Sequence, residues 1–425
     1  METPKPPGPA SADSFHLSNY RWVILTMVFL ATVLNYITRQ TLSIVAPELR
    51  ERYGIGDEGY GMIVSSFMIA YTIMNGISGV MIDKLGSKVG YAVIMVWWSL
   101  AGVAHALVRG VMGFAACRFL LGAGEAGNWP AGVKVVAEWF PPKDRALAGG
   151  IFNSGSAIGA IISPPLVVWL ALHFGFKGVF VVTGLFGFVW LSVWWFVYRP
   201  HPGTPEVTAK NARPVPIWRL LRTKFVTMFA LSNVCMDACW FFYVFWIPKF
   251  LSSKFNYTLA EIGKTAWIPF VTAGLGNLAG GFVTRWLING GASVPKARKI
   301  SCTIFACMMP SAFPAIMASD PKVAIAWISV ATFGYCGFCT NGLAFPADVF
   351  PSRLSATVYG LAAMGTGIGG TVFGWLTGWM VQNYGYGPAF VTYGILPIIG
   401  LLIVLLFLGP LTPDPRFAEE EAPAR

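Results

Sequence analysis

The sequence is poor in charge. Charged residues make up 12% of its 425 residues, whereas soluble domains carry about 25%. Histidine occurs only four times, and the sequence has no His-rich cluster, no Walker A motif and no GxSxG elbow. These absences argue against a metal site, a nucleotide-driven motor and a hydrolase nucleophile. We therefore expect neither an enzyme nor a bound cofactor.

Hydrophobic residues, by contrast, are abundant and make up 55% of the chain. Apolar stretches of roughly 20 residues, long enough to cross a ~30 Å hydrocarbon core, recur along the sequence. The pattern predicts an all-α integral membrane protein. Its twelve transmembrane helices are expected near residues 21–46, 59–81, 90–108, 111–138, 146–171, 178–198, 224–250, 260–288, 299–318, 323–346, 355–381 and 388–409.

An internal repeat divides the chain. Residues 140–160 recur as residues 350–370, and in both copies a charged, proline-broken turn precedes a glycine-spaced apolar helix. The repeat predicts two pseudo-symmetric six-helix bundles, 21–198 and 224–409, with a substrate site between them. The remaining segments are expected to be a disordered N-terminal tail at residues 1–20, a central loop at 199–223 and a C-terminal tail at 410–425.

The basic residues predict the orientation in the membrane. Most of the 30 lysines and arginines fall in loops on the side that holds both termini, so the positive-inside rule places both termini in the cytoplasm. The net charge of +11 then lies beside lipid headgroups and does not indicate a nucleic-acid partner. The seven cysteines all fall within predicted spans, where they are expected to act as small apolar residues.

Four ionisable residues lie deep in predicted spans: Arg39, Arg118, Glu125 and Asp237. A charge near the bilayer centre costs at least about 2.5 kcal/mol, so each needs a partner or a task. Arg118 and Glu125 are two helical turns apart, too far for direct pairing within one helix. Arg39 is the available cation for Glu125. The pair either ties helices together or forms a proton switch, in which protonation of Glu125 frees Arg39 to hold an anion.

Asp237 has three interpretations. It is a second protonation site, an acceptor for a substrate hydroxyl, or a buried acid satisfied by neighbouring polar side chains. Other polar and aromatic residues at depth suit a polyhydroxy acid, because they offer hydrogen bonds to hydroxyl groups and flat faces for a ring. Hydrogen bonding between helices is the competing explanation for most of them. The candidates for substrate binding in this group are Tyr36, Tyr71, Asn153, Ser156, Trp240 and Asn341.

Charged loops flank several spans. Asp83 and Lys84 follow the second span within GVMIDKLGSK, where an acid at a helix end can lock neighbouring helix ends through charge-assisted bonds. Lys143, Arg145 and Arg353 lie in the two repeated turns. They either act at a gate or simply anchor the protein at the membrane surface.

The GVMIDKLGSK loop resembles the signature of the major facilitator superfamily, with Ser87 in place of a basic residue. The motif that begins with Arg118 and ends with Gly122 also resembles that superfamily. Other segments are most similar to the anion:cation symporter branch, and within it to bacterial hexuronate transporters. These segments are NYITR at 35–39, GEA at 124–126, PAG at 130–132, EWFP at 138–141 and ISPPL at 162–166.

The resemblance implies the major facilitator fold and proton-coupled uptake of galacturonate or glucuronate across a bacterial inner membrane. It implies a monomer that works by alternating access, whose partners are an organic anion, protons and the lipid bilayer. It also places Arg39, Tyr71, Arg118 and Glu125 in the central site.

One residue departs from many relatives, because Thr38 stands where they carry an aspartate before the first-helix arginine. This leaves Glu125 as the principal coupling acid and makes Asp237 a candidate replacement. Two alternatives remain open at this point. The carried anion could be an aldonate, a dicarboxylate or an aromatic acid, or the protein could be a membrane sensor that shares the fold without transporting.

Overall fold

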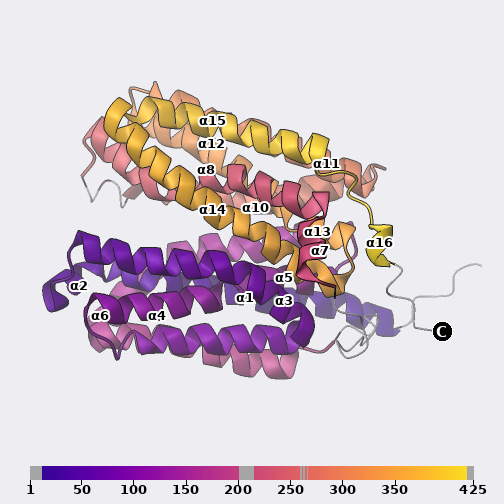
Figure 1. Ribbon diagram of the computed structural model, residues 1–425, viewed down its shortest axis with the longest axis horizontal. Coiled ribbons are helices and arrows are strands. Elements are labelled where there is room, and N and C mark those ends of the chain that lie inside the picture. Colours follow the sequence, from indigo (N-terminus) through magenta and orange to yellow (C-terminus); the bar gives the residue numbers. More distant parts are fainter. Residues whose placement is uncertain (1–11, 201–214, 259–260, 262–263, 266, 419–425) are drawn as a thin grey trace, which may run out of the picture.

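The computed structural model describes residues 12–200, 215–258, 261, 264–265 and 267–418. All regular structure in these ranges is helical, so the predicted all-α fold is confirmed. Two bundles lie side by side with their helices roughly along the long axis (Figure 1). The first bundle, N-terminal to residue 200, comprises α1 (Ala12–Ile44), α2 (Ala46–Tyr53), α3 (Asp57–Ala104), α4 (Gly110–Glu125), α5 (Asn128–Trp139) and α6 (Arg145–Val197).

The second bundle lies C-terminal to residue 215. A short helix α7 (Ile217–Leu221) leads into it, and α16 (Pro415–Ala418) follows it. The bundle comprises α8 (Lys224–Phe255), α10 (Ile268–Asn289), α11 (Val294–Met308), the 3₁₀ helix η1 (Met309–Ile316), α12 (Pro321–Gly342), α13 (Phe345–Val349), α14 (Ser352–Tyr384), α15 (Tyr386–Leu402) and the π-helical turn η2 (Ile403–Phe407).

In the described part of the chain, seven helical stretches are long and apolar enough to cross a membrane. Two of them, Gly59–Ala104 and Arg145–Val197, have 46 and 53 residues, and a helix of that length would extend about 70–80 Å. This is more than twice the ~30 Å hydrocarbon core. The backbone reverses within each at a glycine with positive φ, 75° at Gly86 and 69° at Gly175. Glycine adopts this conformation without steric cost, so each stretch supplies two antiparallel spans.

The helix boundaries differ from the sequence prediction in several places, and one of them is α7, which lies inside the predicted central loop. Helix α1 begins at Ala12, inside the segment predicted as a tail, and α16 lies inside the other predicted tail. The span predicted at 111–138 is divided by a turn at 126–127, directly after Glu125. Most of the predicted central loop, 201–214, lies outside the described residues.

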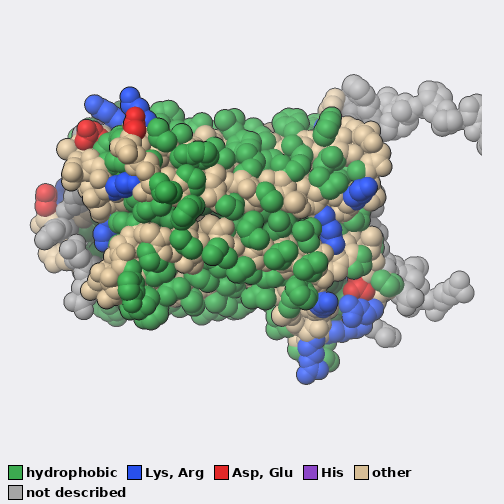
Figure 2. Space-filling model, turned by 90° about the horizontal axis from the view of Figure 1, so that it is seen from above, with side chains coloured by type: hydrophobic (Ala, Val, Ile, Leu, Met, Phe, Trp, Pro, Cys, Tyr) green, Lys and Arg blue, Asp and Glu red, His purple; other side chains and the backbone are tan. Residues whose placement is uncertain are grey.

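Each bundle has its own apolar core. One buried cluster is formed by residues between Leu220 and Phe417. Two others are formed almost wholly by residues before 199, with Leu343 and Ala356 joining one of them. The outer surface is apolar around its middle, and Lys and Arg side chains gather toward the two ends (Figure 2). This pattern is the one expected for a protein that spans a bilayer.

The bundles meet through glycines that occupy equivalent positions in the repeat. A Cβ atom at Gly150 of α6 would lie 2.2 Å from the Asn277 carbonyl oxygen of α10. A Cβ atom at Gly360 of α14 would lie at the same 2.2 Å from the Asn75 carbonyl oxygen of α3. Only glycine permits such contact between helix backbones. The internal repeat therefore corresponds to a symmetric contact between the two halves.

Candidate functional site

A cavity of about 140 Å³ lies between the two bundles. Both halves line it: α1, α3, α5 and α6 on one side, and α8, α12 and α14 on the other. Because it lies between the two repeats, its position matches that of a transporter's substrate site. The structure places these residues of the sequence prediction on its wall: Tyr36, Arg39, Tyr71, Asn153, Ser156, Asp237 and Trp240.

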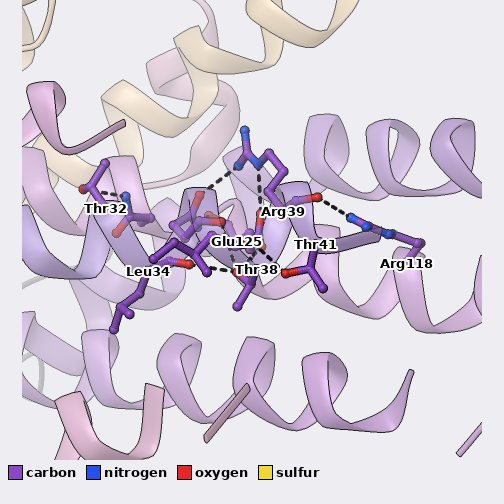
Figure 3. A network of polar contacts seen from close by, with 10 residues as sticks. Thr32, Leu34, Thr38, Arg39, Thr41, Arg118 and Glu125 are labelled. Carbon is purple, nitrogen blue, oxygen red and sulfur yellow. Dashed lines mark hydrogen bonds and ion pairs between the residues drawn. The ribbon is translucent and has the colours of Figure 1, made fainter. Parts of the chain in front are cut away.

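The first-half wall is built on an ion pair between α1 and α4. Arg39 Nε lies 2.9 Å from Glu125 Oε2, and Thr38 Oγ1 donates to Glu125 Oε1 at 2.8 Å (Figure 3). Glu125 is fully buried, whereas about a quarter of the Arg39 side chain is exposed. Gly122, one turn before Glu125, brings α4 against the α3 backbone, because a Cβ atom there would lie 2.5 Å from the Phe67 carbonyl oxygen. The sequence prediction that Arg39 is the available cation for Glu125 agrees with this geometry.

The Arg39 guanidinium has donors beyond those that bind Glu125. Its Nη2 donates to Asn35 Oδ1 at 3.1 Å and its Nε is bound to Glu125, the Tyr71 side chain is a further neighbour in hydrogen-bonding position, and a guanidinium carries five N–H donors in all. Four aromatic rings surround the group, with centroid distances of 4.7–5.6 Å to the guanidinium carbon. They belong to Tyr36, Phe67, Tyr71 and Trp129. The rings hold the cation by cation–π attraction and leave it able to receive an anion.

Two of the residues predicted to bind substrate lie off the cavity wall. Arg118 is buried, and its Nη1 donates to the backbone carbonyl of Arg39 at 2.9 Å, so it supports the helix that carries Arg39. Asn341 is fully buried and bonds to Thr284 at 2.7 Å and Ser301 at 3.0 Å. Its contacts join α12 to α10 and α11, as the competing interpretation of hydrogen bonding between helices expects.

Asp237 forms the opposite wall, on α8. Its Oδ1 accepts a hydrogen bond of 2.5 Å from the Tyr335 hydroxyl, and its Oδ2 accepts one from Thr366. The Tyr335 ring stacks on Trp240, with centroids 5.2 Å apart and planes inclined by 13°. Sequence reasoning named Asp237 and Trp240 but missed Tyr335 and Thr366, because nothing in the sequence shows which neutral residues of other helices face an acid.

A polar bridge links the halves beside the cavity. Trp129 Nε1 donates to Asn153 Oδ1 at 3.0 Å, and Asn153 Nδ2 donates to Asn277 Oδ1 at 2.9 Å. Ser156 donates to the Asn153 carbonyl at 2.7 Å. Asn153 thus contacts both bundles, so movement of one bundle against the other would change its bonding.

The bundles are joined by charged contacts at the end where α5, α13 and α16 lie, which we call the closed end (Figure 1). Asp83 pairs with Lys134 at 2.9 Å and accepts from the Thr357 amide at 2.7 Å, across the two halves. Lys134 also donates to the Ser352 carbonyl at 3.1 Å. Asp83, predicted to lock helix ends, therefore contacts the first turns of α14. Lys134, which the sequence analysis did not single out, is its partner.

A second set of contacts at the closed end centres on Asp348. This acid pairs with Arg298 at 2.9 Å and with Arg145 of the other half at 3.2 Å. Arg145 also donates to the Ala347 carbonyl at 2.5 Å, so it contacts the other half, and its role at a gate stays a prediction. Among the other predicted gating residues, Lys84 and Lys143 are exposed and Arg353 is partly buried near the start of α14.

Comparisons with known proteins agree with this architecture. The profile of the Major Facilitator Superfamily matches residues 28–346 and 296–425. The chain is 31% identical to the hexuronate transporter of Escherichia coli K12, over 91% of this chain and 94% of that one. It is 33% identical to the galacturonate transporter of Dickeya chrysanthemi, over 80% of this chain and all of the relative.

Solved structures support the fold. The human organic anion transporter MFSD10 superimposes with a TM-score of 0.74 at 16% sequence identity, over 90% of this chain and 99% of that one. The two repeated bundles, the cavity between them and the family matches lead to one conclusion. The chain belongs to the Major Facilitator Superfamily and is a multi-pass membrane transporter, not an enzyme.

Proposed function

We propose that the chain imports a hexuronate, galacturonate or glucuronate, together with a proton by alternating access. The relatives named hexuronate transporter and galacturonate transporter support the substrate class. The observation that carries the mechanism is the ion pair between Arg39 and Glu125, at the wall of a cavity inside the membrane. A membrane-embedded ionisable pair of this kind is characteristic of a substrate or proton site.

Arg39 is proposed to bind the substrate carboxylate. Its guanidinium lines the cavity, and a guanidinium holds a carboxylate through parallel charge-assisted bonds. The rest of the wall suits a sugar. Asn153 and Ser156 offer amide and hydroxyl groups, and the stacked rings of Trp240 and Tyr335 offer a flat surface to the CH face of a pyranose.

Glu125 is proposed to couple the proton. While Glu125 is ionised, it neutralises Arg39 through the 2.9 Å contact. A proton on Glu125 removes that negative charge, and the substrate carboxylate then becomes the anion that balances Arg39. Binding of the proton and of the substrate thus favour each other. The hydrogen bond of Thr38 should also change when Glu125 takes up a proton, because the Thr38 hydroxyl bonds to the other carboxyl oxygen of Glu125.

The electrical balance explains why a proton is required. Moving one charge across the membrane potential costs about 2.3 kcal/mol per 100 mV. Entry of a monoanion alone into a negatively charged cell requires this electrical work, whereas a monoanion that enters with one proton carries no net charge across the membrane. The proton gradient then drives accumulation, and the mechanism needs no cofactor.

Alternating access is proposed as a rocking of the two bundles about the cavity. The closed end is then the cytoplasmic gate, and its contacts through Asp83, Lys134, Arg145 and Asp348 break when the site opens inward. The excess of basic residues on the side of both termini supports placing this end in the cytoplasm of a bacterium with an inner membrane. The transporting unit is proposed to be the monomer, since the cavity is completed by one chain.

Uptake into proteoliposomes tests the proposal. Radiolabelled galacturonate and glucuronate are supplied outside, with and without an inwardly directed proton gradient. We expect accumulation above the external concentration only with the gradient, and its collapse on addition of a protonophore. Uptake that equilibrates without responding to the gradient would contradict proton symport. Binding without any uptake would indicate a sensor, and the absence of both would assign the cavity to another organic anion.

A further inference from the structure

The cavity carries one charged side chain from each half. Arg39 on α1 and Asp237 on α8 are the only charged groups among the described residues on its wall. The substrate therefore meets a cation from one bundle and an acid from the other. Arg39 attracts a carboxylate, as the proposed function requires. The proposed function assigns no role to Asp237.

Asp237 is arranged as a hydrogen-bond acceptor. Each of its oxygens receives one hydroxyl, from Tyr335 and from Thr366, and no lysine or arginine in the described part of the chain pairs with it. Two hydrogen bonds leave acceptor capacity on the carboxylate, which has about four lone-pair sites. A hydroxyl group of a ligand can use that capacity, whereas a second carboxylate can only compete for the same donors.

A like charge brought into this end of the cavity would also be repelled. The site is buried, so solvent screens the repulsion little. Juxtaposed like charges discriminate strongly against the wrong partner at such an interface. The far end of the substrate must therefore be an uncharged group, and a hydroxyl there can donate to the carboxylate.

We infer that Asp237 restricts transport to sugar acids with a single carboxylate, by accepting a substrate hydroxyl and repelling a second carboxylate. The inference rests on the proposed function, because it takes the Arg39 end as the site of the first carboxylate. It assigns to Asp237 a role in specificity that is separate from the proton coupling proposed for Glu125.

A matched pair of open-chain ligands tests the inference. Galactonate and galactarate share their configuration and one carboxylate, and they differ only in that the other end is a hydroxymethyl group or a second carboxylate. Each competes with labelled galacturonate for uptake into proteoliposomes of the full chain. We expect galactarate to compete at least about tenfold more weakly than galactonate. Equal competition by the two in the wild-type protein overturns the inference, whatever any variant does.

The variant Asp237→Asn then identifies the residue responsible. It removes the charge and keeps the shape. We therefore expect the ratio of the half-inhibitory concentrations of galactarate and galactonate, which we call the gap, to fall by about fivefold or more. Galacturonate should then bind more weakly, because Asp237 is proposed to accept one of its hydroxyls, while uptake that remains should still respond to the proton gradient through Glu125. Asp414→Asn, which lies outside the cavity beside the exposed Arg416, is the control and should keep the wild-type gap. A gap unchanged in Asp237→Asn overturns the inference.

Two further outcomes remain distinguishable. If Asp237→Asn fails to fold, Asp237→Ser removes the same charge with a smaller side chain, and the wild-type comparison still decides. If the wild-type protein takes up no galacturonate at all, the proposed function fails first, and the inference fails with it. Galacturonate uptake with equal competition by the two ligands instead rejects the inference alone.

Discussion

Asp348 occupies in the second half the place that Glu138 occupies in the first, and each pairs with a cation at the closed end. Glu138 lies 3.6 Å from Lys134, and Asp348 lies 2.9 Å from Arg298. The two acids stand at equivalent positions of the repeat, just before the Phe-Pro pairs of residues 140–141 and 350–351. The same backbone position thus carries an ion-paired acid at the closed end in both halves, although the cations that it binds come from different places in the sequence.

The Arg298–Asp348 pair predicts a large loss of stability in Asp348→Asn. Both side chains are at least 98% buried, so the variant leaves an uncompensated buried arginine, at a cost of about 3–5 kcal/mol. The melting temperature of the purified protein should fall by several degrees. The control is Asp414→Asn, which removes a carboxyl whose pKa is lowered by its hydrogen bonds with the exposed Arg416. Surface pairs contribute little, so a similar loss in both variants would contradict the prediction.

The sequence predicted the bundles and the charged site residues better than it predicted the ion pairs of the closed end. The repeat predicted the two bundles, and the intramembrane charges predicted Arg39, Glu125 and Asp237 as candidates, because charge in an apolar helix is conspicuous. Lys134 and Arg298 were not singled out as gate residues, since cations near a membrane surface have an ordinary explanation. Comparing the two copies beyond the turn would have marked Asp348, as it aligns with Glu138.

The turn after Glu125 and the roles of Arg118 and Asn341 could not be predicted. All three depend on which neighbouring helix packs against a given face. A single sequence with apolar residues on every face does not show which helix that is. Arg118 bonds to a backbone carbonyl of α1, an acceptor that every residue possesses. Trp129, Tyr335 and Thr366 were missed for a similar reason, because uncharged residues do not stand out in an apolar chain.

Glu125→Gln should separate substrate binding from energy coupling. Glutamine keeps a hydrogen-bonding side chain beside Arg39 but takes up no proton. We expect exchange of labelled for unlabelled galacturonate to persist, and accumulation driven by a proton gradient to be lost. Glu261→Gln, on the surface near Thr258, serves as the control and should accumulate normally. Full gradient-driven accumulation by Glu125→Gln would remove Glu125 from the coupling mechanism.

Arg39→Lys should weaken binding although it keeps the charge. Lysine cannot bond to Glu125, Asn35 and a substrate carboxylate in the fixed geometry of a guanidinium. The loss of one or two charge-assisted hydrogen bonds corresponds to about 10- to 100-fold in affinity. The measurement is the concentration of galacturonate that gives half-maximal exchange. Arg52→Lys, in an exposed pair with Glu48, should leave this value unchanged, and an unaltered value in Arg39→Lys would argue against Arg39 as the carboxylate site.

Cys339 should report occupancy of the cavity. Its side chain lies on the cavity wall and is partly exposed, and a maleimide reacts with the thiolate form. Saturating galacturonate should slow labelling of Cys339 severalfold in a variant whose other cavity cysteine, Cys336, is replaced by serine. Cys307, exposed on the outer surface of α11, is the internal control, and its labelling should not respond to substrate. Equal protection of both cysteines would indicate a global change of conformation and not occupancy of this cavity.

Gly360→Val tests the contact between the bundles. The new Cβ atom would lie 2.2 Å from the Asn75 carbonyl oxygen, so α14 and α3 must separate at the closed end. Overpacking of this kind costs about 1–3 kcal/mol, and the cost falls on the conformation in which the two helices touch. Gly374→Val lies on the same helix, where a Cβ atom meets nothing within 4 Å, so it controls for the change of residue type. Gly360→Val should transport more slowly and label faster with a membrane-impermeant thiol reagent at a cysteine placed at position 357. The same rates in both glycine variants would mean that this contact does not limit the opening of the closed end.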